Sequence, residues 1–75
     1  MEPIENTFGG KAVGLTFNPS GDERVNRLKM LYADIINELD AMRGDRSEQA
    51  RLASIAITEA QGAQMWAVKA VTWKD

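Results

Sequence analysis

The residues that decide the fold are 53–70, which read ASIAITEAQGAQMWAVKA. Alanine recurs in this stretch at alternating spacings of three and four residues, which is the period of one face of an α-helix. The alanines of this stripe are Ala53, Ala56, Ala60, Ala63, Ala67 and Ala70. Because their side chains are small, the stripe predicts a seam along which another helix can approach closely.

Apolar residues also cover the rest of this predicted helix. Leu52, Ile55, Trp66 and Trp73 lie beside the alanine stripe, and Ile57, Met65, Val68 and Val71 lie on the far side. A helix that is apolar nearly all round is buried nearly all round, and one partner helix covers only one face. We therefore expect a symmetric homo-oligomer, whose interface contains Ala60, Ala63, Trp66, Ala67 and Ala70.

A first helix is predicted upstream, over residues 21–43. Ser20 and Glu23 have the spacing of a capping box, which satisfies free amides at a helix start. The apolar residues that follow, at spacings of three and four, are Val25, Leu28, Tyr32, Ile35, Leu39 and Met42, with Leu31 and Ile36 beside them. Gly44 is expected to take the left-handed conformation that ends a helix.

A second helix is predicted over residues 47–73. Asp45 or Ser47 begins it, and Glu48 follows Asp45 at the spacing of a second capping box. The short link folds this helix back on the first, which gives an antiparallel hairpin with arms roughly 30–40 Å long. Residues 1–20 are rich in glycine and hold both prolines, so we expect a mostly irregular N-terminal arm. The sequence thus predicts a single all-α domain over residues 1–75.

Composition limits the classes of function. The 75 residues include no cysteine and no histidine, so neither a disulfide nor a Cys/His zinc site can form. A domain this small buries little apolar surface, and association with further copies is the remaining way to stabilise it. Nine Lys and Arg against eleven Asp and Glu give a net charge of −2, which disfavours binding to polymeric nucleic acid.

The compartment is also predicted. The sequence contains no run of about eighteen apolar residues that could span a membrane. Its first residues, MEPIE, lack the basic and apolar pattern of a signal peptide. We therefore expect a cytoplasmic protein that makes no membrane contact.

The pattern of an enzyme is missing. Gly9-Gly10-Lys11 resembles a fragment of a phosphate-binding loop, but neither Ser nor Thr follows the lysine and no strand is predicted before it. Asp34, Glu38 and Asp40 are typical of a solvated helix surface rather than of a metal site. The prediction is a protein without catalytic residues, metal or cofactor.

The segment Phe17-Asn18-Pro19, just before the first predicted helix, allows two interpretations. In one, the aromatic ring stacks on a nucleotide base while the helix amides face a phosphate. In the other, Phe17 plugs the end of the hairpin. Lys29 lies within reach of this segment, and taken alone it is typical of a solvated lysine.

Lys69 shares a helix face with Trp66 and Trp73. A lysine between tryptophans can hold a phosphate or lie against a base by cation–π attraction. Alternatively, its stem covers apolar surface while the ammonium stays in water. The tryptophans themselves are typical of interface anchors.

Two segments resemble the phage anti-CBASS protein two family. Residues 54–71, SIAITEAQGAQMWAVKAV, are similar to the last helix of that family, whose core pattern Met-Trp-Ala-x-Lys/Arg-Ala-Val stands here at Met65 to Val71. Residues 14–22, GLTFNPSGD, are similar to the family's approach to its first helix. The resemblance covers about residues 11–73. A related phage family, the Thoeris anti-defence protein one, shares the hairpin domain.

The resemblance implies a helical homohexamer that binds the cyclic oligonucleotide messengers of bacterial CBASS immunity. Such a protein is a sponge, because it withholds the messenger from its effector and releases it chemically intact. Cyclic dinucleotides such as cyclic GMP-AMP are expected in pockets between protomers, and cyclic trinucleotides in separate pockets near the symmetry axis.

The resemblance also implies binding residues. The aromatic that stacks on a base corresponds to Phe17. The lysine that contacts phosphate corresponds to Lys29 by approximate position, whereas a strict count from Phe17 points nearer Tyr32. The basic residue of the Met-Trp-Ala core is Lys69. The predicted ligand-binding set is Phe17, Asn18, Pro19, Lys29, Tyr32, Lys69 and Trp73.

Two other hypotheses stay open on the sequence. A helical adaptor or inhibitor would dock its apolar second helix on a host or phage protein, and would form a smaller assembly that exposes Trp66 or Trp73. An enzyme that degrades the signal would show turnover and a metal requirement.

Overall fold

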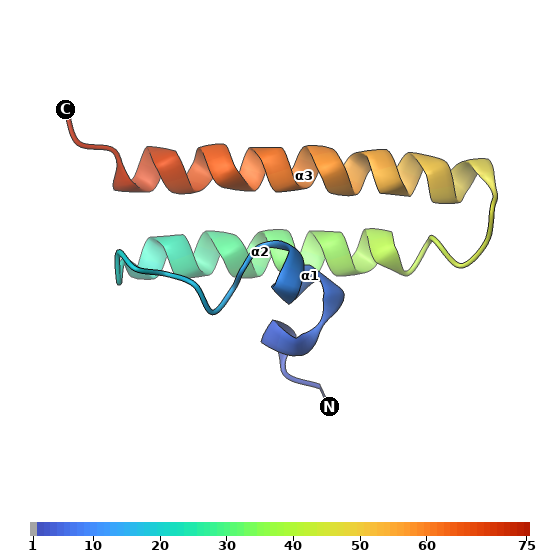
Figure 1. Cartoon of the computed structure of the whole chain (residues 1–75), viewed down its shortest axis with the longest axis horizontal. Coiled ribbons are helices and arrows are strands. Elements are labelled where there is room, and N and C mark those ends of the chain that lie inside the picture. The colour runs from blue at the N-terminus through green and yellow to red at the C-terminus, as the bar shows by residue number, and fades with distance from the viewer. Residues whose placement is uncertain (1) are drawn as a thin grey trace.

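The computed structural model describes residues 2–75. Within this part of the chain every regular element is a helix, which confirms the all-α class. The elements are the 3₁₀ helix η1 (Ile4–Asn6) and the α-helices α1 (Phe8–Ala12), α2 (Glu23–Asp40) and α3 (Glu48–Thr72). α2 and α3 lie side by side and antiparallel, while α1 packs on the opposite side of α2 (Figure 1).

The fold is a single flat layer. Its principal extents are 44, 30 and 13 Å, and the smallest is close to the diameter of about 10–12 Å that a helix has with its side chains. α2 therefore has neighbours on two sides, and the chain from the end of α1 crosses in front of α2 (Figure 1) and contacts α3, where the Gln61 amide group donates to the Ala12 carbonyl oxygen at 3.4 Å. Within residues 2–75 no helix is long and apolar enough to cross a membrane.

The expectation of an irregular arm is wrong for residues 4–12, which form η1 and α1. Gly9 lies so close to α2 that an added Cβ would stand 2.1 Å from the Ala33 carbonyl oxygen. Asn37 of α2 holds the arm, because its side chain accepts from the Gly9 amide at 2.7 Å and donates to the Thr7 hydroxyl at 2.9 Å. Glycine at position 9 thus serves close helix packing rather than irregular backbone.

α2 buries the predicted seam only in part: Val25 is buried, and Leu28, Tyr32 and Leu39 are half-buried. Ile35 and Met42 of that seam are exposed. The arm is the cause, because it gives α2 a second partner besides α3. The buried residues of α2 are Val25, Lys29, Ala33 and Ile36. The core joins α2 to the arm and to α3 through Val13, Leu15, Ala33, Ile36 and Ile57.

α3 also turns a different face toward α2. Its buried residues are Ala50, Ala53, Ile57 and Gln64. Ile57, expected on the far side, therefore belongs to the core. Beyond Ala53, Ala60 is the member of the alanine stripe that packs against this core. Ala56, Ala60 and Ala67 are half-buried, and Ala63 and Ala70 are exposed.

The start of α2 differs from the predicted capping box. Asp22 is the N-cap, since its side chain accepts from the Arg24 amide at 2.7 Å. Ser20 instead accepts from the Asp22 amide at 3.1 Å, so its hydroxyl shapes the loop before the helix. An Asp at this position also places negative charge at the positive end of the helix dipole.

The turn between the long helices differs as well. α2 ends at Asp40, and Gly44 lacks the expected left-handed conformation, since Gly14 and Gly21 are the glycines of positive φ within residues 2–75. The chain leaves α2 through a tightened last turn, in which the Met42 amide donates to the Leu39 carbonyl at 3.0 Å. Ser47 caps α3 by accepting from the Ala50 amide at 3.1 Å.

Candidate functional site

A tight turn after α1 presents Phe17 beside the start of α2. The Phe17 amide donates to the Gly14 carbonyl oxygen at 2.9 Å, and Gly14 has φ +62°, a conformation that favours glycine. The Phe17 side chain is 70% exposed. The turn thus leaves an aromatic surface free to stack on a planar ligand.

Side-chain hydrogen bonds fix the loop between Phe17 and α2. The Asn18 amide group donates to the Asp22 carbonyl oxygen at 3.0 Å, and the Ser20 hydroxyl donates to Asn18 Oδ1 at 2.6 Å. Because Asn18 and Ser20 use these polar atoms within the loop, their role is to hold its shape, with Pro19 between them.

Lys29 is the unusual residue of this region. It projects from α2 beneath the turn, is only 6% exposed, and donates from Nζ to the Gly14 carbonyl oxygen at 3.1 Å and to the Phe17 carbonyl oxygen. Its Nζ lies 5.7 Å from the centroid of the Phe17 ring. The interpretation of Lys29 as a solvated lysine is therefore wrong.

The charge of Lys29 has no carboxylate partner among residues 2–75, where the ion pairs are Arg43–Asp40 and Arg51–Glu48. Burial lowers the pKa of Lys29, because desolvation disfavours the charged form. An ammonium has three donors, and two of them are used by the carbonyls. An unpaired buried charge is costly for a fold, and such groups cluster at functional sites.

Lys29 and Phe17 line one side of a pocket of about 300 Å³ at the open end of the hairpin. Val25 of α2 and Val68 and Thr72 of α3 also line it. The pocket thus combines an aromatic ring, apolar walls and a buried cation. This combination suits a ligand with a planar ring and a nearby anionic group.

Other predicted ligand-binding residues lie elsewhere in the chain. Tyr32 is half-buried and packs against the core, so it does not line this pocket. Lys69 lies on a neighbouring face of α3, because consecutive residues of a helix are about 100° apart, and Trp73 is the extended residue that follows α3. The chain therefore brings together Phe17, Asn18, Pro19 and Lys29, and separates them from Tyr32, Lys69 and Trp73.

Lys69 forms a second, exposed group with the tryptophans. Its Nζ lies 5.2 Å from the Trp66 ring centroid and 5.7 Å from that of Trp73. The two tryptophans are 70% and 62% exposed, and a shallow hollow of about 250 Å³ is lined by Met65, Trp66 and Lys69. This group displays a cation–π cluster on an open face of the layer.

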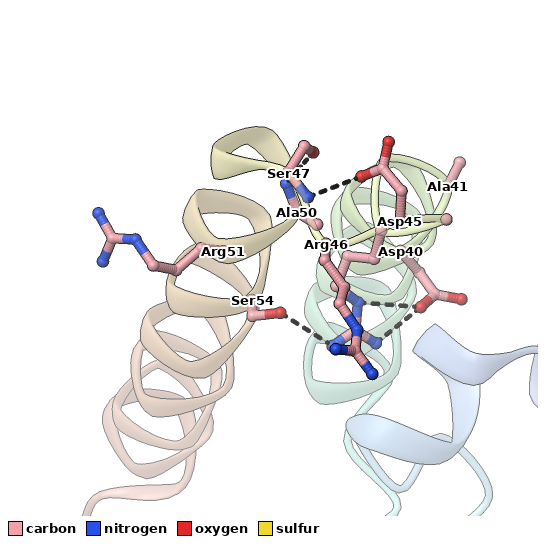
Figure 2. Close-up of a pocket in the computed structure, with 10 residues that line it drawn as sticks. Asp40, Ala41, Asp45, Arg46, Ser47, Ala50, Arg51 and Ser54 are labelled. Atoms are coloured by element: carbon pink, nitrogen blue, oxygen red, sulfur yellow. Dashed lines mark hydrogen bonds and ion pairs between the residues drawn. The ribbon is translucent and has the colours of Figure 1, made fainter.

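The turn end of the hairpin holds a larger hollow, of about 550 Å³ (Figure 2). Arg43 crosses it, pairing with Asp40 at 2.7 Å and donating to the Ser54 hydroxyl at 3.3 Å. Its guanidinium also lies 5.0 Å from the Phe8 ring centroid. Arg43 thereby ties together α1, α2 and α3, which is a structural task.

Sequence reasoning missed four pocket residues: Ser20, Val25, Val68 and Thr72. Val68 and Thr72 are four residues apart on α3 and so share a face, which is the signal that could have found them. Within residues 2–75 no group of three His, Cys, Asp or Glu side chains is arranged to hold a metal ion.

The chain was compared with models of known protein families, with curated proteins and with solved structures. The family model described as Acb2/Tad1, hairpin domain, matches residues 10–72, and the chain belongs to that family. Membership indicates a phage anti-defence role that involves small signalling molecules. Searches of curated proteins and of solved structures found no match.

Proposed function

We propose that this member of the Acb2/Tad1 hairpin family is a non-catalytic sponge. It acts in the cytoplasm of the infected bacterium and sequesters cyclic oligonucleotide messengers of CBASS immunity without degrading them. Its ligands are cyclic dinucleotides such as cyclic GMP-AMP, and cyclic trinucleotides. The observation that carries the proposal is the buried, carboxylate-free Lys29 beside the exposed Phe17 ring.

This pair matches the chemistry of a nucleotide. A base presents a flat π surface to the aromatic ring, and base–aromatic stacking contributes about 1–3 kcal/mol per base. A phosphate oxygen can accept a hydrogen bond from the remaining N–H of the Lys29 ammonium. Its negative charge also pairs with that ammonium, which has no carboxylate partner. The overall charge of −2 does not oppose this, since fields in physiological salt fade over about 8 Å.

The flat fold favours a site completed by further protomers. A layer 13 Å deep leaves apolar side chains uncovered on its broad faces, among them Leu31, Ile35, Leu52, Ile55, Met65, Trp66 and Trp73. Contiguous apolar surface of this kind marks an interface. A symmetric homohexamer covers it with copies of the same chain, and repeats the Phe17–Lys29 pair around a ligand that itself repeats base and phosphate.

The test is isothermal titration calorimetry with cyclic GMP-AMP and cyclic triadenylate, on protein whose mass in solution is known from light scattering. We expect binding at a fraction of one ligand per protomer. The bound nucleotide, recovered after denaturation, should have an unchanged mass, because a sponge breaks no bond. A cleaved product would instead identify an enzyme, and no heat from either ligand would contradict the proposal.

Phe17→Ala tests the stacking role. We expect a loss of dinucleotide affinity of about 1–3 kcal/mol per stacked base, with the assembly unchanged. Phe8→Ala is the matched control, since Phe8 is also a partly exposed aromatic near a cation but lies by Arg43 at the turn end. Equal affinities of Phe17→Ala and wild type would exclude stacking on Phe17.

A second candidate function is a helical adaptor or inhibitor. The exposed cluster of Met65, Trp66 and Trp73 favours it, because aromatic and Met side chains are enriched at binding hot spots. This function requires the cluster to be free in the unbound protein. Light scattering separates the two: a monomer favours the adaptor, whereas a stable oligomer that protects the tryptophans from a fluorescence quencher favours the sponge.

A further inference from the structure

We infer that Lys29 is a positioning residue, whose ammonium holds the Gly14–Phe17 turn and so orients the Phe17 ring. Its effect on ligand binding rests on the proposed function, but its effect on the turn does not. Lys29 then has two tasks at one site. It offers a donor to an anionic group, and it fixes the place of the aromatic surface beside that group.

The hydrogen bonds of the turn carry this inference. The Gly14 carbonyl oxygen accepts from the Phe17 amide at 2.9 Å and from Lys29 Nζ at 3.1 Å. The Phe17 carbonyl oxygen also accepts from Lys29 Nζ. One ammonium therefore clamps both ends of the turn to α2, from a residue 12 to 15 positions further along the chain.

The Phe17 side chain depends on its backbone for its position. A ring that is 70% exposed makes few packing contacts, so neighbouring side chains hold it only weakly. The bonds of the following loop are local, from Asn18 to Asp22 and from Ser20 to Asn18. Such bonds shape the loop but do not attach the turn to a helix. Leu15 packs in the core, and Lys29 supplies the hydrogen bonds that attach both ends of the turn to α2.

The clamp distinguishes lysine from arginine at position 29. A compact ammonium with three donors fits between two carbonyl oxygens at a site that is 6% exposed. A guanidinium is larger and planar, with its donors in a fixed fork. Lys29→Arg therefore keeps the positive charge but loses the clamp. If charge alone matters, Lys29→Arg binds like wild type; if positioning matters, it binds like Lys29→Met.

The first experiment needs no ligand. Hydrogen exchange is followed by NMR at two amides of the same loop in wild type, Lys29→Met and Lys69→Met. The Phe17 amide bonds to Gly14 within the clamp, whereas the Leu15 amide bonds to the Gly10 carbonyl outside it. In Lys29→Met we expect the Phe17 amide to exchange about tenfold faster while Leu15 is unchanged. Lys69→Met, an exposed lysine beside two aromatic rings, should change neither amide.

Unchanged exchange at Phe17 in Lys29→Met would overturn the inference. If Lys29→Met unfolds, both amides lose protection together, and Lys29→Gln then decides on the same two amides, because its shorter, neutral side chain removes the ammonium of the clamp but keeps a polar group at the buried position. In that variant, faster exchange at Phe17 alone supports the clamp, and equal behaviour of the two amides rejects it.

The second experiment is a double-mutant cycle with cyclic GMP-AMP, measured by calorimetry. Each single variant lowers the affinity by some factor, and independent effects would multiply in Phe17→Ala/Lys29→Met. If Lys29 acts largely through Phe17, the fold-loss of affinity in the double variant is smaller than that product by about threefold or more. Losses that multiply would reject the coupling. If wild type binds no cyclic nucleotide, the proposed function fails, while the exchange experiment still decides on the clamp.

Discussion

The two ends of the hairpin differ in how their positively charged side chains are neutralised. At the turn end, Arg43, just after α2, pairs with Asp40 of α2 at 2.7 Å, and Arg51 pairs with Glu48 of its own helix at 2.6 Å. At the open end, Lys29 is buried among backbone carbonyls, and within residues 2–75 it forms no ion pair. The turn end has the larger hollow, of about 550 Å³ against about 300 Å³. Charge balance therefore points to a ligand site where pocket size does not.

The contrast has a physical basis. A paired arginine has its charge satisfied, so an incoming anion must compete with a carboxylate that is already in place. A buried lysine without a carboxylate gains by binding an anion, because the anion supplies the interaction that desolvation removed.

The largest expected effect is on stability, and it tests whether the two ends of the hairpin depend on the same hydrophobic core. Ile36 is fully buried in the core between α1, α2 and α3. We expect Ile36→Ala to lower the free energy of unfolding by about 2–5 kcal/mol, through lost burial and a new cavity. Thermal and urea unfolding measure the change. Exchange rates should rise at both ends together; a rise at one end alone would mean that the ends are independently stable.

The next effect concerns assembly. Ala63 is an exposed member of the alanine stripe on α3. We expect Ala63→Leu to weaken the oligomer by about 1–3 kcal/mol, since a large side chain prevents close helix approach. Sedimentation velocity measures the assembly. Ala41→Leu, at an exposed alanine of the turn end, is the control and should sediment like wild type. An unchanged profile for Ala63→Leu would show that this stripe is not an interface.

A smaller effect distinguishes the two hollows directly. Val68→Phe places a ring in the open-end pocket without changing any charge. We expect it to lower affinity for cyclic GMP-AMP about tenfold, or about 1.4 kcal/mol. Gly44→Phe places the same ring at the turn-end hollow, where an added Cβ meets no atom within 4 Å, and should bind like wild type. Calorimetry that ranks the two variants in the reverse order would move the site to the turn.

These contrasts also show which parts of the fold can be predicted from the sequence. The two long helices follow from local signals, namely apolar periodicity and side chains that cap helix starts, and the family resemblance follows from a local motif. The helices of the N-terminal arm do not follow from local signals. Two adjacent glycines are typical of a loop, and the reason for Gly9, its close contact with the backbone of α2, is visible only in the folded structure. The predicted seam of α2 is wrong at Ile35 and Met42, which are exposed, since α1 is a partner that periodicity does not reveal.

The site was predictable only in part. Phe17-Asn18-Pro19 stands out in the sequence, but Lys29 looks like any surface lysine of a helix. Its burial depends on carbonyl groups of a turn 12 to 15 residues earlier in the chain. The pattern of side chains does not predict the direction of these backbone groups. Lys69 and Trp73 were grouped with Phe17 by analogy, whereas within one chain they face another direction.

The smallest expected effect is at the paired, exposed end. The Arg51 guanidinium beside Glu48 lowers the pKa of that carboxyl, and the pair is more than half exposed. A carboxyl with a lowered pKa stabilises the fold above its unfolded pKa, and this contribution is lost as the pH falls through the folded pKa. Solvent screening keeps it small, so Arg51→Met should leave neutral-pH unfolding unchanged within error. Its measurable effect is the pKa of Glu48, which NMR titration should find raised toward its ordinary value. A clear loss of stability or of ligand affinity in Arg51→Met would mean that the turn end does more than close the hairpin.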